Sequence, residues 1–112
     1  MNPIQLQHTA TVIGRLTDFA QPADAVLSAY FRDHKKLGRQ DRHEIAETAF
    51  AALRHWQKIQ AVLDEPQRQH RRTALAALVL GRGFNIGSLE ELADEEERRW
   101  LAGPTLSLAD FA

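Results

Sequence analysis

The segment from His43 to Glu47 contains the residue types of a catalytic zinc motif. In H-E-x-x-H, two histidines one helical turn apart bind the ion and the glutamate acts as a base. Here Glu47 stands where the second histidine is needed, and no other histidine has ligand spacing to this segment. We expect no metal site: Glu44 as a helix cap and a polar pair between His43 and Glu47 explain the segment better. A small metalloenzyme is kept only as a third hypothesis.

A second motif is the glycine-rich stretch from Gly81 to Gly87, which follows the apolar run from Ala74 to Leu80. A dinucleotide-binding loop has the spacing G-x-G-x-x-G and connects a strand to a helix. This stretch is one residue too long, and the preceding run is rich in alanine and leucine, as in a helix. It therefore predicts a helix end and a turn, and no cofactor site.

The third candidate is a group of basic residues in the middle of the chain. Between Arg32 and Arg72 there are ten Lys/Arg against six Asp/Glu, a local balance of +4, whereas the part from Phe84 onward has a balance of −5. Guanidinium groups near helix N-termini are suited to binding phosphates, because free N–H donors converge there. Our candidate RNA-binding residues are Lys35, Lys36, Arg39, Arg42, Arg54, Lys58, Arg68, Arg71 and Arg72.

A simpler interpretation of the basic residues is a solvated surface whose charge is neutralised locally. Carboxylates lie close to them in the sequence, at Asp41, Glu44, Asp64 and Glu65. A cation at a helix N-terminus also opposes the helix dipole. No aromatic stacking platform is evident, so base-specific recognition of single strands is not predicted.

Helices must position all of these residues, since no segment shows sustained strand alternation. The first helix begins at the Asn2-Pro3 pair and ends before Pro22, which opens the second helix. Gly38 ends the second helix, and Asp41 with Glu44 forms a capping box for the third. The apolar faces expected are Ala10, Ile13, Leu16, Phe19 and Ala20 in the first helix, and Val26, Leu27, Tyr30 and Phe31 in the second.

The third helix is the most regular, and the fourth is the most apolar. The third has an apolar stripe with spacings of four and three: Ile45, Ala49, Ala52, Trp56, Ile59 and Leu63. The segment 64–66 stops it. The fourth helix spans about 68–82 and is apolar on every side between Ala74 and Leu80, as in a helix surrounded by others. One or two short helices follow, with capping boxes at Ser88/Glu91 and Asp94/Glu97, and bury Leu89, Leu92, Trp100 and Leu101.

The bulk properties exclude several classes of protein. The chain of 112 residues suffices for one domain, which we place at 1–102, and 103–112 is expected to begin a linker. No apolar run is long enough to cross a bilayer, and no signal peptide is evident at the N-terminus. The absence of cysteine excludes disulfides and thiol nucleophiles within this chain and is consistent with a cytoplasmic location.

Four segments together resemble a known family. They are 22–32 (PADAVLSAYFR), 37–42 (LGRQDR), 45–48 (IAET) and 53–54 (LR). In combination they resemble the N-terminal NusB-like domain of the Sun/Fmu-type ribosomal RNA (cytosine-5) methyltransferases. The resemblance implies an all-α, NusB-like bundle of about six helices around a central apolar helix. In the family pattern the turn from Leu37 to Arg42 forms the central corner, which favours structural roles for Asp41 and Arg42.

The resemblance also implies a catalytic domain that follows this one, binds S-adenosylmethionine and uses cysteine to attack the pyrimidine. Neither the cofactor fingerprint nor a cysteine is present here, so no catalytic or cofactor-binding residue is assigned. The antitermination factor NusB binds RNA through an arginine-rich first helix, whereas the first helix of this chain contains only Arg15. An RNA site is therefore expected on the nine residues named above.

Two functions follow as hypotheses. The first is a non-catalytic module that engages ribosomal RNA through its basic middle and docks onto its own C-terminal methyltransferase domain. The second is a protein-interaction module that docks the catalytic domain or another protein without contacting RNA. The second predicts a contiguous apolar patch that the isolated domain leaves uncovered.

Overall fold

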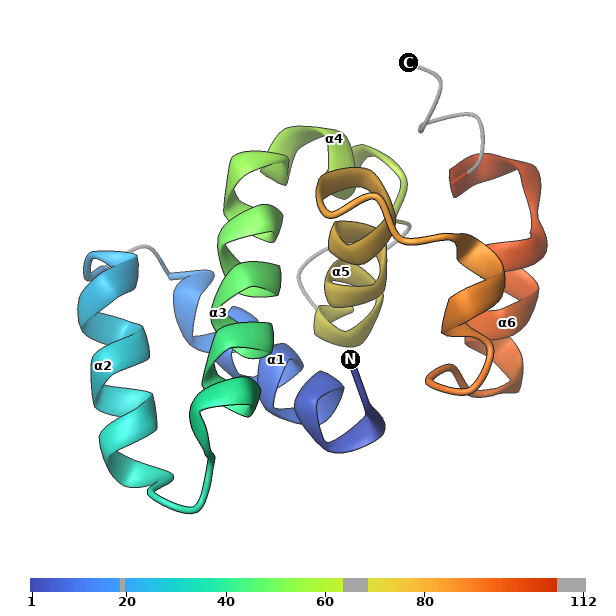
Figure 1. The fold of residues 1–112 in the computed structure, drawn as a ribbon. Helices are drawn as coiled ribbons and strands as arrows, with labels where there is room; N and C mark the ends of the chain where they lie inside the picture. The colour runs from blue at the N-terminus through green and yellow to red at the C-terminus, as the bar shows by residue number, and fades with distance from the viewer. Residues whose placement is uncertain (19, 64–68, 107–112) are drawn as a thin grey trace.

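The computed structural model describes residues 1–18, 20–63 and 69–106, and within them every regular element is helical. The α-helices and two short turns of other helix types are arranged as in Figure 1, which confirms the all-α class. In chain order the elements are α1 (Pro3–Leu16), α2 (Ala23–Asp33), α3 (Arg39–Arg54), α4 (Trp56–Ala61), α5 (His70–Ala76), the π-helical turn η2 (Ala77–Gly81), the 3₁₀ turn η3 (Ile86–Leu89) and α6 (Glu95–Ala102).

Short polar signals set where the first helices begin. The Asn2 side chain accepts a hydrogen bond from the Gln5 N–H at 2.8 Å, and the Gln5 side chain accepts one from the Asn2 N–H at 2.9 Å. This reciprocal capping box and Pro3 at the first helical position confirm the predicted start of α1. Pro22 precedes α2, as predicted. The buried face of α1 differs from the prediction: Leu6, Thr9 and Val12 join Ile13 and Leu16, whereas Ala20 is exposed and Phe19 lies outside the described residues.

The start of α3 corrects the predicted capping box. The helix begins at Arg39, two residues before the expected cap, and the Asp41 carboxylate accepts the N–H of Gly38 at 3.3 Å. Asp41 therefore closes the first turn from inside the helix, and Glu44 is not a capping residue. The predicted long third helix is also interrupted, because His55 takes a non-helical conformation between α3 and α4. The expected stop at 64–66 lies outside the described residues.

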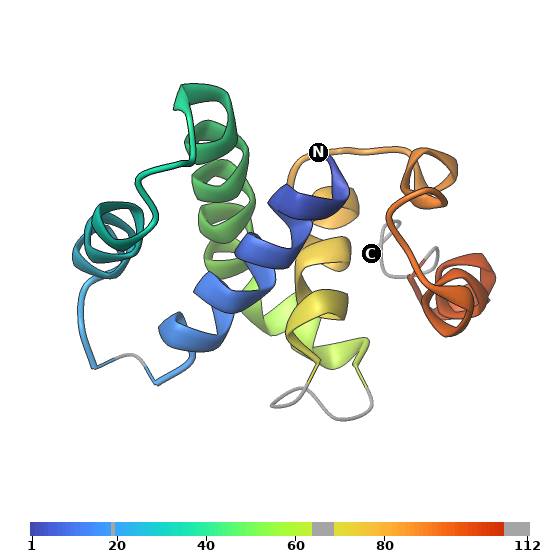
Figure 2. The same ribbon diagram turned by 90° about the horizontal axis from the view of Figure 1, so that it is seen from below.

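The apolar run of the fourth predicted helix forms the centre of the fold, as predicted. All side chains from Ala74 to Val79 are 0–4% exposed. They belong to α5 and η2, which pack against α1 and α3, while α2 and α6 lie at opposite ends of the molecule (Figures 1 and 2). The helix widens to a π turn at Ala77–Gly81, where the Arg82 N–H bonds to the Ala77 carbonyl at 3.0 Å. This turn ends the helix at the glycines, as predicted.

Two apolar clusters form the core. The larger one joins α1, α3, α5 and α6 and contains Leu75, Leu78, Leu89 and Leu101. The smaller one fills the space between α1, α2 and the start of α3. Leu106, which we placed in the linker, is fully buried in the larger cluster. Packing therefore extends beyond the predicted domain end at Ala102, and residues 107–112 lie outside the described part.

The C-terminal elements agree with the prediction only in part. Asp94 and Glu97 form the expected reciprocal capping box at the start of α6. Ser88 and Glu91 do not form one, because Asn85 caps the 3₁₀ turn η3 and the Ser88 hydroxyl donates to the Asn85 carbonyl at 2.6 Å. Within the described residues, no helix is sufficiently long and apolar to cross a membrane.

Candidate nucleic-acid interface

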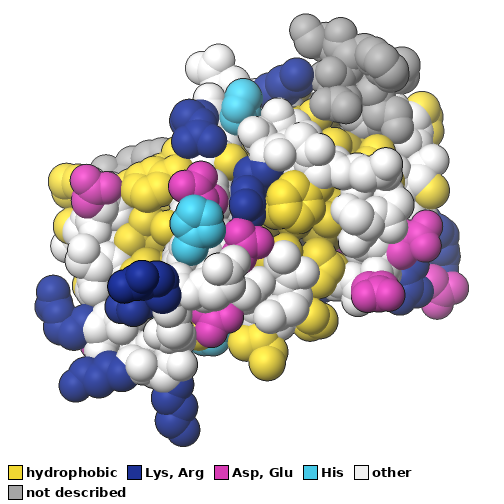
Figure 3. Space-filling model, in the orientation of Figure 1, with side chains coloured by type: hydrophobic (Ala, Val, Ile, Leu, Met, Phe, Trp, Pro, Cys, Tyr) yellow, Lys and Arg dark blue, Asp and Glu magenta, His cyan; other side chains and the backbone are white. Residues whose placement is uncertain are grey.

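The structure separates the predicted basic residues into three places. Four of them surround the connection between α2 and α3, which we call the α2–α3 corner: Lys35, Lys36, Arg39 and Arg42. All four are exposed, and none forms an ion pair with a carboxylate in the described part of the chain. In Figure 3, Lys and Arg side chains project from the end of the molecule that carries this connection.

Burial of a single leucine holds the α2–α3 corner in place. Leu37 lies between the lysines and Gly38, is 9% exposed, and joins the smaller core cluster. The chain then enters α3 at Gly38, where an added Cβ would meet nothing within 4 Å. Arg39 and Arg42 follow at a spacing of three residues, so they lie on neighbouring positions of one helix face. The four cations thus sit on an anchored turn and on the first turn of the helix that follows it.

Asp41, which lies between Arg39 and Arg42 in the sequence, is engaged by other groups. Its Oδ1 accepts a hydrogen bond from Nε2 of Gln5 in α1 at 2.9 Å, and its Oδ2 accepts the N–H of Gly38. These bonds tie the start of α3 to α1 and agree with the structural role expected for Asp41. Arg42, for which the family pattern also favoured a structural role, is exposed and makes no hydrogen bond or ion pair through its side chain with a described residue.

Arg54 is the last residue of α3, and Lys58 lies in α4, which follows it. About 15 residues at 1.5 Å each separate Arg39 from Arg54, which places them roughly 22 Å apart along the helix. The break at His55 leaves an open cavity of about 520 Å³ lined by residues 53–58. This second basic group does not merge with the α2–α3 corner. Arg68 lies outside the described residues.

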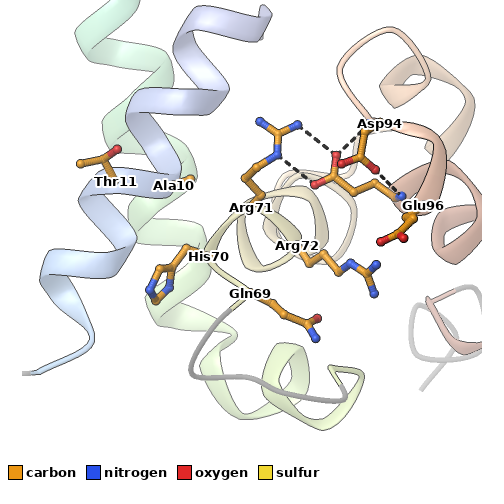
Figure 4. Close-up of a pocket in the computed structure, with 9 residues that line it drawn as sticks. Ala10, Thr11, Gln69, His70, Arg71, Arg72, Asp94 and Glu96 are labelled. Atoms are coloured by element: carbon orange, nitrogen blue, oxygen red, sulfur yellow. Dashed lines mark hydrogen bonds and ion pairs between the residues drawn. The ribbon is translucent and has the colours of Figure 1, made fainter.

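Arg71 is bound to a carboxylate of its own molecule. Its Nε donates to Oε2 of Glu97 at 2.9 Å, and its Nη2 donates to Oε1 of Glu97 at 3.0 Å (Figure 4). Its Nη2 also donates to the Leu92 carbonyl at 3.2 Å. The hydrogen bonds that Arg71 donates to Glu97 raise the pKa of Arg71 further above its usual value, against the effect of burial. Arg71 joins α5 to α6, which makes it a structural residue more than a phosphate ligand.

Arg72 is also engaged, and its surroundings are acidic. Its guanidinium lies 5.5 Å from the centre of the Trp100 ring, within the range of a cation–π contact. Asp94, Glu96 and Glu97 line the same cleft as Arg71 and Arg72. The three carboxylates outnumber the two guanidinium groups, so the cleft has no surplus of positive charge for binding phosphate. Because Glu97 faces Arg71, reversing the charge of Arg71 would place two carboxylates opposite each other and should destabilise the domain.

Sequence reasoning missed the cluster around Glu44. Its Oε1 accepts a hydrogen bond from the Met1 ammonium at 3.1 Å, and its Oε2 accepts one from Nη2 of Arg82 at 3.0 Å. Nη1 of Arg82 also donates to the Thr48 hydroxyl at 3.1 Å. Burial would raise the pKa of Glu44, but the bonds from Arg82 and Met1 outweigh it and lower that pKa. The sequence offered one indication that Glu44 is buried: it precedes Ile45 and lies one helical turn before Thr48, on the buried face of α3.

A second missed cluster joins α1 to α2. The Tyr30 hydroxyl lies 2.5 Å from Nδ1 of His8, and the His34 ring stacks on Tyr30 with centroids 4.0 Å apart. Nδ1 of His34 donates to the Tyr30 carbonyl at 2.8 Å. Burial lowers the pKa of His8, as does the nearby His34, whereas Asp41 opposes them. This cluster supports the end of α2, directly before the α2–α3 corner.

The zinc-like motif is dispersed by the fold. Glu44 is turned inward to Arg82 and the N-terminus, while His43 and Glu47 are exposed. In the part of the chain that the structure describes, no three His, Asp or Glu side chains are grouped as a metal ion needs.

Comparison of the chain with protein-family profiles, with curated proteins and with solved structures gives no match.

Proposed function

We propose that this chain is a non-catalytic helical module that helps an S-adenosylmethionine-dependent ribosomal RNA (cytosine-5) methyltransferase engage its RNA. The sequence resemblance to the NusB-like domain of that family supplies the parent activity, and the all-α bundle with a central apolar helix is compatible with it. In this proposal the methyltransferase domain holds the cofactor and the cysteine nucleophile, since this chain has no cysteine. The module docks onto that domain and presents its basic surface to the RNA.

The observation that carries the RNA contact is the α2–α3 corner. Its four cations are exposed and without carboxylate partners among the described residues, so binding a phosphate requires no ion pair of the protein to be broken. Hydrogen bonds from guanidinium and ammonium groups to phosphate do not depend on sequence, so the corner positions the RNA backbone and does not select bases. Arg54 and Lys58 form a separate basic group, because Arg54 lies roughly 22 Å from Arg39 along α3, and Arg71 is bound to Glu97.

Salt dependence tests this contact. Four phosphate contacts predict that log K falls against log salt concentration with a slope of roughly −2.8 to −3.6. The measurement is fluorescence anisotropy with a labelled ribosomal RNA hairpin. The double change Arg39→Gln/Arg42→Gln should weaken binding and reduce the slope by about 1.4 to 1.8. Arg98→Gln/Arg99→Gln removes the same charge from α6 and should leave the slope unchanged. Equal effects of the two pairs would refute a localised contact.

The docking function without RNA receives less support from the surface. It predicts a contiguous uncovered apolar patch, but among the described residues Ile4, at 64% exposure, is the only exposed large hydrophobic side chain. One isolated side chain does not make an interface. Tight binding of this chain to the separate methyltransferase domain, with no measurable affinity for ribosomal RNA at low salt, would reverse this preference.

A further inference from the structure

The cleft shown in Figure 4 lies between α1 and α6, and the first turn of α5 forms its floor. We call it the α1–α6 cleft. Ala10 and Thr11 line it on one side and Asp94 and Glu96 on the other, with Gln69 to Arg72 between them. Its volume is about 460 Å³, within the range of small-molecule sites. The Arg71–Glu97 ion pair and the capping box at Asp94 fix the wall facing α1.

Two residues of this cleft contain buried polar atoms without a partner. Oε1 of Gln69 and Nδ1 of His70 are buried and form no hydrogen bond with any described residue. Buried polar groups are nearly always satisfied, and each exception calls for an explanation. An amide oxygen can only accept, and an imidazole nitrogen can accept when it is unprotonated. Both atoms could accept from a donor, but they are buried and the His70 ring lies against Gly14 of α1 (Figure 4). A ligand in the open part of the cleft reaches them only if these side chains turn, so its first contacts are Arg72 and Glu96.

The charges around the cleft select the class of ligand. Arg71 and Glu97 neutralise each other, which leaves Arg72 opposite the carboxylates of Asp94 and Glu96. A free anion meets these carboxylates and a free cation meets Arg72, so neither is favoured. An uncharged ligand that offers both donors and acceptors can use both kinds of group. A nucleobase with an exocyclic amino group has this chemistry, because carboxylates accept from its amino group and guanidinium groups donate to its ring or carbonyl acceptors.

A flat cationic surface suitable for stacking is also present. The Arg72 guanidinium is held over the Trp100 ring at 5.5 Å, and the side chain extends from α5 toward α6 (Figure 4). Bases that leave a helix stack on aromatic rings and on guanidinium planes. The sequence offered no such platform, because Arg72 and Trp100 are brought together only by the packing of α6 against α5.

We propose that the α1–α6 cleft binds one unpaired nucleobase that carries an exocyclic amino group, with Glu96 accepting from the amino group and Arg72 stacking on or donating to the ring. The proposal rests on the proposed function in taking RNA as the natural ligand. The cleft would then select a base, whereas the α2–α3 corner contacts only the RNA backbone and does not distinguish sequences. The two sites lie on different elements, since the α2–α3 corner is formed by residues 35–42.

Nucleosides test the cleft separately from the corner, because they carry no phosphate. We expect cytidine or adenosine, titrated into the ¹⁵N-labelled full chain, to shift the amide resonances of residues 69–72 and 94–97 in NMR spectra. Uridine should shift the same resonances with a dissociation constant at least about tenfold higher, as for the loss of one specific base contact. Inorganic phosphate is the third ligand. Equal shifts from uridine, shifts at these residues from phosphate alone, or no shifts from any nucleoside would each overturn the proposal.

A matched pair of variants completes the experiment. Glu96→Ala should weaken cytidine or adenosine binding by about tenfold. Glu91→Ala removes an exposed carboxylate that does not line the cleft and should leave affinity unchanged. Equal losses in both variants would overturn the assignment of Glu96. If only the cleft proposal is wrong, nucleosides cause no shifts but hairpin binding still depends on salt with the expected slope. If only the RNA contact at the α2–α3 corner is wrong, that slope is absent but the nucleoside shifts remain.

Discussion

Arg71 holds Glu97 through two hydrogen bonds of 2.9 and 3.0 Å, although 26 positions separate them in the sequence. Glu97 also accepts the N–H of Asp94 at 2.9 Å, so the same carboxylate caps α6 and joins that helix to α5. The side chain of Glu97 is 6% exposed, while that of Arg71 is 42% exposed. A residue expected to contact RNA therefore secures the last helix of the fold.

Replacing Arg71 with alanine should lower the free energy of unfolding by about 1–2 kcal/mol, because Glu97 then keeps its charge in a buried position with fewer donors. This figure is discounted for the exposure of Arg71. Urea denaturation followed by circular dichroism measures the change. Arg71→Lys should recover only part of the loss, since an ammonium cannot form the paired geometry. An alanine variant as stable as the native protein would contradict the assigned role.

The Glu44 cluster predicts sensitivity to acid. The pKa of Glu44 is lowered in the folded state, so the unfolded chain binds its proton first as the pH falls. Stability from this group is complete above about pH 4.5, the ordinary value for glutamate, and is lost as the pH falls through the lowered folded value. Glu44→Gln should reduce stability at pH 7 by about 2–4 kcal/mol, since Arg82 and the N-terminus lose their counter-charge.

The same variant gives a check on direction. Because glutamine does not titrate, the difference in stability between the native protein and Glu44→Gln should shrink as the pH falls below about 4.5. Glu47→Gln, at an exposed position on the same helix, should show no such convergence. Parallel curves for the native protein and Glu44→Gln from pH 7 to pH 3 would show that the carboxylate does not act through its charge.

His8 predicts a second loss of stability at milder acidity. Its folded pKa lies below the ordinary value of 6.5, so between these two values the unfolded chain binds more protons than the folded chain. Stability should therefore decline as the pH falls from about 6.5 to the lowered value. Burial is the main cause of this lowering; the His34 ring, 5.3 Å away between centroids, adds to it, while Asp41 opposes it.

His8→Gln should flatten the stability profile between pH 7 and pH 5, and melting temperatures measured across this range provide the test. His43→Gln serves as the control, because His43 is exposed. If the melting temperature of His8→Gln falls with pH as steeply as that of the native protein, other groups cause the loss of stability.

Gly81 predicts a steric effect where η2 meets α3. A Cβ at this position would lie 2.8 Å from Cβ of Ala51, closer than real side chains approach. Gly81→Ala should therefore destabilise the domain by about 1–3 kcal/mol, as for overpacked cores. Gly38→Ala is the matched control, because an added methyl group there meets nothing within 4 Å. Thermal unfolding compares the two, and equal melting temperatures would show that the helices can separate without loss.

Local signals in the sequence were sufficient for much of the fold. Asn2-Pro3, Pro22 and the Asp94/Glu97 box act within one turn of the chain, and the apolar run from Ala74 needs no partner to be recognised as central. The capping prediction at Asp41 failed because Asp41 and Glu44 are both possible acceptors near the helix start, and local sequence does not show which one accepts the N–H of the cap residue. The tertiary contact of Asp41 with Gln5 of α1 fixes Asp41 in that position.

The site was harder to predict than the fold. A cation in the sequence gives no indication of whether a carboxylate faces it in space. In the sequence, Lys36 and Arg71 are equally good candidates for a phosphate contact. In the structure, Lys36 is exposed on a turn, whereas Arg71 of α5 is paired with Glu97 of α6. Glu44 and Arg82 are 38 positions apart, and their pairing depends on how α3 crosses η2.

The burial of Leu106 affects how this polypeptide should be shortened for experiments. A truncation after Ala102 would discard a fully buried leucine and leave a hole in the larger core cluster. Holes of that size cost proteins about 2–5 kcal/mol, a large share of the stability of a small domain. A shortened version intended to preserve the native packing has to retain Leu106.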